Sequence, residues 1–287
     1  MKSLINVFMK NTILLTCICA LMVPVAFSQK VSIDAIVSKN LASIVSPDRK
    51  TKLVNITALG ESTYVQGNNH QRPWTGKSAV VSDGKKLAIA MTFPLDNYPI
   101  DRINFDGKKL TVPYITPGVR SALGLYLVKN EEIVKEGLFG GVLSTGWTFH
   151  YPEEKKGSMS VQGTKEIDGR QAYIVSYSSK AGSGISIRLF FDVETGQHLR
   201  TEYRRVISAQ MGPTPELSAK QNETIEELSE DFRDFKTENG VTLPRSYTLR
   251  LANVYGGNRR EFLYSLKLSD FYYDQQLDAA TFEIENK

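Results

Sequence analysis

Cysteine is nearly absent from this chain of 287 residues. The two cysteines, Cys17 and Cys19, both lie in an apolar stretch close to the first residue. Thr16 and Ile18 precede them where lipid attachment requires a small residue, so we do not expect either cysteine to be lipidated. Removal of the apolar stretch would leave a chain that can form no disulfide and carry out no thiol chemistry.

Histidine is scarce as well, with His70, His150 and His198 only. None of them lies near a second histidine at metal-ligand spacing, and no cysteine is available to complete a zinc site. We expect each histidine at the surface or in a turn. The sequence also has no Gly-x-Ser-x-Gly elbow and no phosphate-binding glycine loop. The expectation is a protein without metal or cofactor that is not an enzyme.

An excess of either charge is missing too. The 35 Lys and Arg against 31 Asp and Glu give no electrostatic reason to expect nucleic acid as a partner. One acidic cluster consists of Glu226, Glu227, Glu230, Asp231 and Asp234. Paired carboxylates can act as acid and base in glycoside hydrolysis, but they then need partial burial. A dense acidic run beside Lys236 instead indicates a solvated face.

No apolar run is long enough to span a bilayer, which takes about 20 residues. The run 13–27 is shorter, follows Lys2 and Lys10, and ends at the small residues of Ala26-Phe27-Ser28. This pattern predicts a signal peptide, 1–28, that is cleaved after export to a bacterial periplasm. An association with the outer membrane is compatible with that location. The remainder, 29–287, is expected to form a single domain.

Period-two alternation of apolar residues is what the sequence has in abundance. A helix is expected first, over 31–45, and Ser46-Pro47 ends it. The alternating segments that follow, each predicting a strand with one apolar face, are 87–93, 110–114, 185–191, 243–251 and 262–268.

Turn dipeptides separate these segments. Asp83-Gly84, Asp106-Gly107, Asp168-Gly169 and Asn239-Gly240 all accept the positive φ of tight hairpin turns. The segment 192–196 likewise joins two strands. Many short strands with hairpin signals predict a mainly β (α+β) protein with an antiparallel sheet.

Two segments depart from this rhythm. Residues 117–146 indicate two short helical stretches, 123–127 and 133–142, interrupted by glycines. This insertion either covers an apolar surface or acts as a lid, and covering the core is the favoured interpretation. In 223–235, apolar residues at helical spacing indicate an amphipathic helix.

Aromatic residues gather at the expected strand ends and loops: Tyr64, Trp74, Trp147, Phe149, Tyr151, Phe271, Tyr272 and Tyr273. Such residues can line the mouth of an apolar cavity, and Trp74 and Trp147 are the candidates for that position. They can equally close the ends of a barrel.

Several phrases of the sequence resemble the superfamily of the LolA and LolB lipoprotein carriers, whose relatives include the sigma-factor regulator RseB and the mycobacterial LppX. The N-terminal helix followed by 53–60 is similar to their opening. Further phrases with this resemblance lie at 103–108, 190–203, 238–244 and 277–282.

The resemblance implies a strongly curved antiparallel sheet that forms an unclosed barrel around an N-terminal helix and the helical insertion. It also implies that 223–235 is a strand, and we follow it there. In such proteins the concave face is apolar and accepts acyl chains, and too few helices are expected here to bury all of that face.

These considerations predict a binder or carrier of an apolar ligand, with a lipid or an acylated protein as its partner. Burial of an acyl chain would drive binding at roughly 0.8 kcal/mol per methylene. The inward-facing residues expected to line the cavity are Leu87, Ile89, Met91, Leu110, Ile185, Ile187, Leu189, Leu249 and Leu266. The alternative is an interaction or sensor module of the RseB kind, which would recognise an envelope protein.

Overall fold

The computed structural model describes residues 31–49, 53–67, 72–151, 157–180, 182, 184–209 and 222–283. The chain divides into two units, Met1–Val31 and Ser32–Lys287. The predicted signal, 1–28, and His70 lie outside the described residues. In the part of the chain that is described, no helix is long and apolar enough to cross a membrane.

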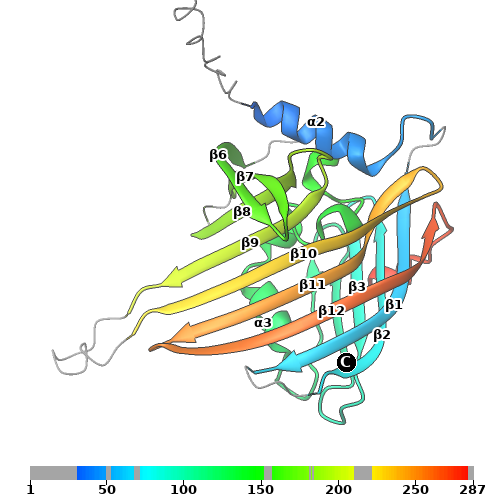
Figure 1. Ribbon diagram of the computed structural model, residues 1–287. Coiled ribbons are helices and arrows are strands. Elements are labelled where there is room, and N and C mark those ends of the chain that lie inside the picture. Colours follow the sequence, from blue (N-terminus) through cyan, green and yellow to red (C-terminus); the bar gives the residue numbers. More distant parts are fainter. Residues whose placement is uncertain are drawn as a thin grey trace, which may run out of the picture. The chain divides into compact units, whose positions relative to one another are not determined.

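The second unit is built on one antiparallel sheet of 12 strands that does not close into a barrel (Figure 1). The predicted mainly β architecture is therefore confirmed. The first five strands are β1 (Asn55–Gln66), β2 (Trp74–Asp83), β3 (Lys86–Thr92), β4 (Ile100–Phe105) and β5 (Leu110–Thr111). The other seven are β6 (Ser158–Ile167), β7 (Arg170–Ser178), β8 (Ile185–Asp192), β9 (His198–Ile207), β10 (Thr224–Glu238), β11 (Val241–Tyr255) and β12 (Asn258–Tyr273).

The strand order is β5-β4-β3-β2-β1-β12-β11-β10-β9-β8-β7-β6. Every strand thus pairs with a neighbour in sequence, except where β1 pairs with β12. In that pairing Tyr64 lies opposite Tyr264, and Tyr64 also lies opposite Trp74 on β2. The edges of the sheet are β5 and β6, which follow one another along the chain.

The four predicted turn dipeptides all lie between paired strands, as expected. At Asn239-Gly240 both residues have positive φ, 52° and 73°, which is the backbone of the tight turn that matches the twist of a hairpin. Among the predicted strands, only 110–114 is shorter than predicted. The strand there, β5, ends at Thr111.

Two glycines permit the close approaches at which β1 and β2 bend. A Cβ atom at Gly60 would lie 1.9 Å from the Lys267 carbonyl oxygen, beside a register shift in the β1–β12 pairing. A Cβ at Gly76 would lie 1.8 Å from the Thr92 carbonyl oxygen. Any larger residue would push the strands apart, so these positions support the curvature of the sheet.

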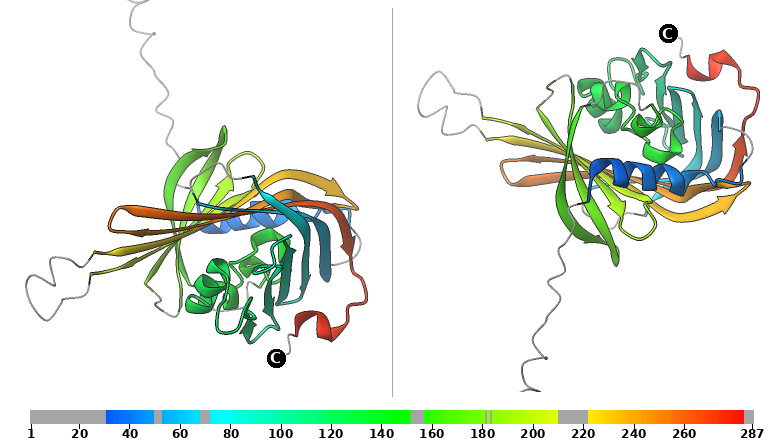
Figure 2. Two further views of the ribbon diagram at one scale, coloured as in Figure 1. Left: turned by 90° about the horizontal axis from the view of Figure 1, so that it is seen from below. Right: turned by 90° about the horizontal axis from the view of Figure 1, so that it is seen from above.

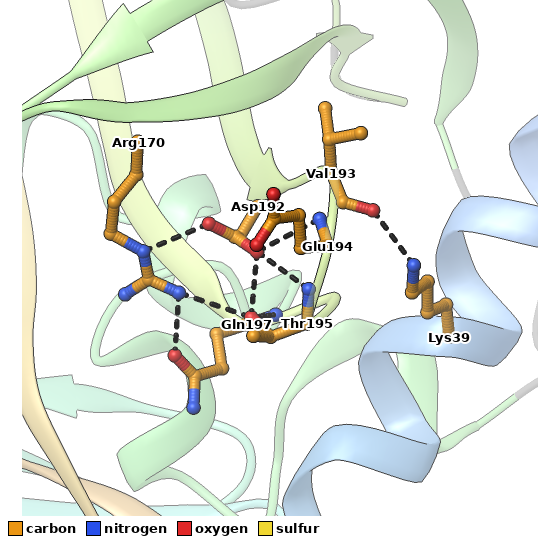
Figure 3. A network of polar contacts seen from close by, with 7 residues as sticks. All are labelled: Lys39, Arg170, Asp192, Val193, Glu194, Thr195 and Gln197. Carbon is orange, nitrogen blue, oxygen red and sulfur yellow. Dashed lines mark hydrogen bonds and ion pairs between the residues drawn. The ribbon is translucent and has the colours of Figure 1, made fainter.

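The predicted N-terminal helix is α2 (Ile33–Ile44), which lies across one end of the sheet (Figure 1). Ser32 caps it by accepting a hydrogen bond from the Ala35 amide at 3.2 Å. Lys39 donates to the Val193 carbonyl in the turn between β8 and β9 (Figure 3).

That turn is held from within by Asp192. Its carboxylate accepts hydrogen bonds from the Thr195 amide at 2.6 Å and from the Arg170 guanidinium at 2.8 Å (Figure 3). The residues around 192–196 therefore stabilise the turn and hold α2 against it. Their polar contacts have a structural role.

The predicted insertion, 117–146, lies in the connection between the two edge strands, of which the structure describes 112–151 and 157; from here on we call 112–151 the insertion. They contain α3 (Ala122–Lys129), α4 (Glu132–Lys135), η1 (Gly141–Leu143) and η2 (Thr148–His150). The insertion lies on one face of the sheet, which curves around it (Figure 2). We call this the inner face. The last short helix, η3 (Ala279–Phe282), packs against β3.

Residues 223–235 lie in β10, as the resemblance predicted and the helical spacing did not. Glu226, Leu228, Glu230 and Phe232 alternate as buried residues along this strand. Since two of these buried positions are glutamates, the apolar residues no longer show a period of two, and the pattern resembles that of a helix.

Candidate functional site

The nine predicted cavity-lining residues are all buried: Leu87, Ile89, Met91, Leu110, Ile185, Ile187, Leu189, Leu249 and Leu266. Their exposed fractions do not exceed 8%. None of them is among the residues that line the hollows of about 540, 360, 210 and 60 Å³. The insertion, whose Leu123, Leu127 and Leu138 are fully buried, lies on one face of the sheet (Figure 2). The insertion thus covers the inner face, in line with the favoured interpretation.

Polar contacts attach the insertion to the sheet at several separate points. Arg205 on β9 donates to the Asn130 side chain at 2.9 Å. Ser82 on β2 accepts from the Thr145 amide at 2.9 Å. Glu136 of the insertion accepts from the Tyr177 hydroxyl at 2.6 Å. The insertion therefore depends on polar as well as apolar contacts for its position.

The most deeply buried of these attachments is the Glu230 carboxylate on β10. It accepts hydrogen bonds from the Tyr203 hydroxyl at 2.7 Å, the Tyr247 hydroxyl at 2.5 Å and the Gly140 amide at 2.8 Å. Burial raises the pKa of Glu230 from 4.5 to about 7, although the three donors oppose this rise. Glu230 thus joins two strands of the sheet to the insertion.

This position corrects the interpretation of the acidic cluster as a solvated face. Glu226, Glu230 and Asp231 are buried, with exposed fractions of 8%, 0% and 4%. Only Asp234 is fully exposed, and Glu227 pairs with Arg259. The prediction was wrong because it was based on composition, whereas the strand alternates these carboxylates between its two faces.

Trp147, predicted at a cavity mouth, instead lies in the interior with no exposed surface. Its indole N–H donates to the Asn40 side chain on α2 at 3.1 Å, and its ring stacks on His198 at 4.7 Å. His198 is also fully buried, so its predicted surface position is wrong. Burial lowers the pKa of His198 to about 3, which keeps the imidazole neutral.

These two rings belong to what we call the core cluster: Trp147, Phe149, Phe191, His198, Phe232 and Tyr247. Neighbouring ring centroids lie 4.7 to 5.8 Å apart. Gly141 of the insertion packs directly on it, since a Cβ atom there would lie 2.7 Å from the His198 Nδ1 atom. This part of the inner face is filled.

Trp74, the other predicted mouth residue, is half-buried and lines the hollow of about 540 Å³. We call it the Trp74 hollow. Its walls come from the inner-face side chains of β1, β2 and β12, from the loop between β3 and β4, and from the first part of the insertion, 115–122. It is therefore a place where the insertion and the sheet do not close upon each other. Its volume lies within the usual range of ligand sites.

A second group of rings, which we call the hollow cluster, lies at this place: Tyr64, Trp74, Phe93, Tyr98 and Tyr264. All of them except Phe93 line the hollow. Tyr64 is its centre, with ring centroids of Trp74 at 5.7 Å, Tyr98 at 5.2 Å and Tyr264 at 5.0 Å. This arrangement follows from the strand register, which places Tyr64 between Trp74 and Tyr264. Trp74 is partly exposed, whereas the other four rings are buried, with exposed fractions of at most 7%.

The tyrosine hydroxyls at the hollow stay protonated near neutral pH. Burial raises the pKa of Tyr64 to about 12, and the charge of Arg260 acts in the opposite direction. Behind the rings, Asp101 is 2% exposed and accepts from the Tyr98 hydroxyl at 2.6 Å. Burial raises the pKa of Asp101. The tyrosine hydroxyls thus add no negative charge to the hollow, whose lining also includes Arg120 and Arg260.

The other hollows are smaller. The one of about 210 Å³ lies among paired charges such as Arg188 and Glu202. The one of about 60 Å³ is small, and the one of about 360 Å³ lies beside Val45 and Thr145. In the described part of the chain, no three His, Cys, Asp or Glu side chains gather in a way that could hold a metal ion.

The sequence did not point to Tyr98, Arg120, Arg260 or Tyr264 as residues of a site. A signal existed for two of them, since Arg260, Phe262 and Tyr264 alternate and so share a face of β12. Arg120 lies at the hollow because of the path that the insertion follows, and no local sequence pattern predicts that path.

No family model matches the chain, and no curated protein matches it. Among solved structures, a LolA superfamily protein from Nitrosomonas europaea is 10% identical, with 88% of this chain and 98% of that chain covered and a TM-score of 0.44. A DUF1329 family protein from Desulfovibrio piger is 12% identical, with 88% and 97% covered and a TM-score of 0.47. The lipoprotein LppX from Mycobacterium tuberculosis is 11% identical, with 86% and 100% covered and a TM-score of 0.20. The sequence phrases resemble a superfamily that includes LolA and LppX, and these names occur in the first and the third of these structures.

Proposed function

We propose that this protein binds the apolar part of a lipid-like ligand between the inner face of its sheet and the insertion, with the Trp74 hollow as the point of entry. The observation that carries this proposal is the hollow itself. It lies at the boundary between sheet and insertion, and aromatic side chains of the inner face form its wall.

The ligand would contact the hollow cluster first. Each methylene removed from water there contributes roughly 0.8 kcal/mol, so a chain of several methylenes binds without specific polar contacts. Leu249 lies opposite Tyr264 on the neighbouring strand, and Leu266 follows Tyr264 on the same face. An acyl chain longer than the hollow would have to displace part of the insertion to reach these two residues.

The chain has only two tryptophans, and they make the proposal testable. Trp74 lines the hollow, whereas Trp147 is fully buried in the core cluster. A fatty acid methyl ester with bromine atoms on its acyl chain quenches indole fluorescence on contact. We expect saturable quenching in the wild type and loss of most of it in a Trp74→Phe variant, in which Trp147 is the only indole.

Trp147→Phe is the matched control, because it leaves Trp74 as the only indole and should be quenched strongly. Extraction of the purified protein with organic solvent, followed by mass spectrometry, would identify a lipid that copurifies with it. Absence of saturable quenching in the wild type, together with an extract free of lipid, would refute the proposal and favour a module that recognises a protein.

A further inference from the structure

Two arginines line the Trp74 hollow. Arg120 belongs to the insertion and Arg260 to β12. The residues that line the hollow include no aspartate or glutamate, and in the described part of the chain no carboxylate forms an ion pair with either arginine. The net charge at the opening is therefore positive.

Arg120 is held in place by its surroundings. Its Nε atom donates to the Val112 carbonyl at 2.8 Å, and its guanidinium lies 4.1 Å from the centroid of the Tyr114 ring. These contacts engage one of the five N–H donors of the guanidinium and fix its plane. The donors on the terminal nitrogens are then available to a planar or tetrahedral anion.

Arg260 ends a row of inner-face residues on β12 that continues with Phe262 and Tyr264. Its guanidinium lies 5.0 Å from the centroid of the Phe262 ring. Arg260 lines the hollow, and its charge lowers the pKa of the Tyr64 hydroxyl there. A cationic end and an aromatic floor therefore follow one another along a single strand.

The one carboxylate near the hollow does not cancel this charge at the surface. Asp101 lies behind the rings, 2% exposed, and its oxygen accepts from Tyr98. A cationic ligand such as a quaternary ammonium would find aromatic faces here, but it would have to approach two guanidinium groups. Charge complementarity favours an anion instead.

We propose that the Trp74 hollow selects an amphiphile whose polar end is an anion, a carboxylate or a phosphate, held between Arg120 and Arg260 while its apolar part lies on the hollow cluster. This inference rests on the proposed function and specifies its ligand class. The carboxylate of a free fatty acid and the phosphate of a lipid headgroup share the required chemistry.

The experiment compares brominated ligands with one acyl chain and three ends: the carboxylate, its neutral methyl ester and a phosphate monoester. Affinity is measured by tryptophan quenching in the wild type and in Arg120→Gln and Arg260→Gln. We expect one or both anions to bind about tenfold more tightly than the ester, as a charge-assisted hydrogen bond implies, and each variant to lose most of that preference. The anion that binds more tightly identifies the kind of headgroup.

Arg188→Gln is the matched control, since Arg188 lies on the outer face of β8 and pairs with Glu202. It removes the same charge far from the hollow and should leave the preference unchanged. If the ester binds as tightly as both anions, and the two variants do not alter this, the inference is overturned while the proposed function stands. If no ligand binds at all, the proposed function fails first.

Discussion

The core cluster and the hollow cluster are two groups of aromatic rings on the same face of one sheet. Every ring of the first is buried, whereas the second includes the partly exposed Trp74 beside a hollow. In the core cluster, Gly141 and Trp147 of the insertion fill the space above His198. In the hollow cluster, the insertion stays at a distance from Trp74 and leaves about 540 Å³ open. Similar residue types thus serve stability in one region and can serve binding in the other. The path of the insertion determines which of these two roles each region can have.

Trp147→Ala should give the largest effect. Trp147 is fully buried, and its indole N–H is paired with Asn40. Removal of a buried tryptophan costs about 4 kcal/mol of unfolding free energy, measured by chemical denaturation. If the protein does not fold, Trp147→Phe should still show a loss of about 2 kcal/mol. A loss below that of Trp74→Ala would contradict the comparison.

Gly141→Ala should disrupt the packing of the core cluster where the insertion contacts it. The residue has φ +47°, and a Cβ atom would lie 2.7 Å from both the His198 Nδ1 and the Phe232 Cζ atoms. Backbone strain and overpacking together should lower the unfolding free energy by about 3 kcal/mol. Gly169→Ala is the control. It shares the positive φ, +79°, but has nothing within 4 Å, so it should lose only about 1 kcal/mol.

Glu230 should make the attachment of the insertion dependent on pH. Its pKa is raised from 4.5 to about 7, so between these values the folded protein binds a proton that the unfolded chain releases. The contribution of Glu230 to the unfolding free energy should therefore fall as pH rises through this window, by up to about 1.4 kcal/mol per pH unit, whereas buried His198, with its pKa lowered to about 3, contributes a rise over the part of the window below 6.5. Glu230→Gln should remove the falling contribution and so make the slope more positive than in the wild type, whereas Glu227→Gln, on the outer face, should leave the wild-type slope unchanged. Equal slopes in all three proteins would disprove the assignment.

Trp74→Ala should have the smallest effect on stability. Trp74 is half-buried at the edge of the hollow, so its loss should cost only about 1 kcal/mol in denaturation experiments. Its effect on binding should be larger than its effect on folding, because the ligand loses an aromatic wall. A stability loss as large as that of Trp147→Ala would show that the hollow is part of the packed core.

The sequence predicted the parts of the fold that local chemistry determines. Alternation gave β3, β8, β11 and β12, the turn dipeptides marked hairpins between strands, and Ser46-Pro47 marked the end of α2. β10 required the family resemblance, because Glu226 and Glu230 on its buried face interrupt the apolar pattern. A buried carboxylate depends on partners from distant strands, and these are not visible within a short window of sequence.

The candidate site was only half predictable. Trp74 was expected at an opening, and it lines one. Trp147 was expected there too, but the turn from Gly146 directs it inward to Asn40 and His198. Arg120 and Arg260 line one hollow although they are far apart in the sequence, and a periodic pattern cannot reveal a contact over such a separation. The paths of long connections decide such pairs, and tertiary packing sets those paths.

The pairing of β1 with β12 has a consequence for how the molecule assembles. Residues near Ile56 must find residues near Tyr273, almost the whole described chain away, while every other pairing joins strands adjacent in sequence. The loop entropy of this closure is large, so the two ladders, β1–β5 and β6–β12, should form before they join. During synthesis the pairing of β1 with β12 cannot form until β12 has emerged. Until then, two unprotected strand edges remain available for wrong partners.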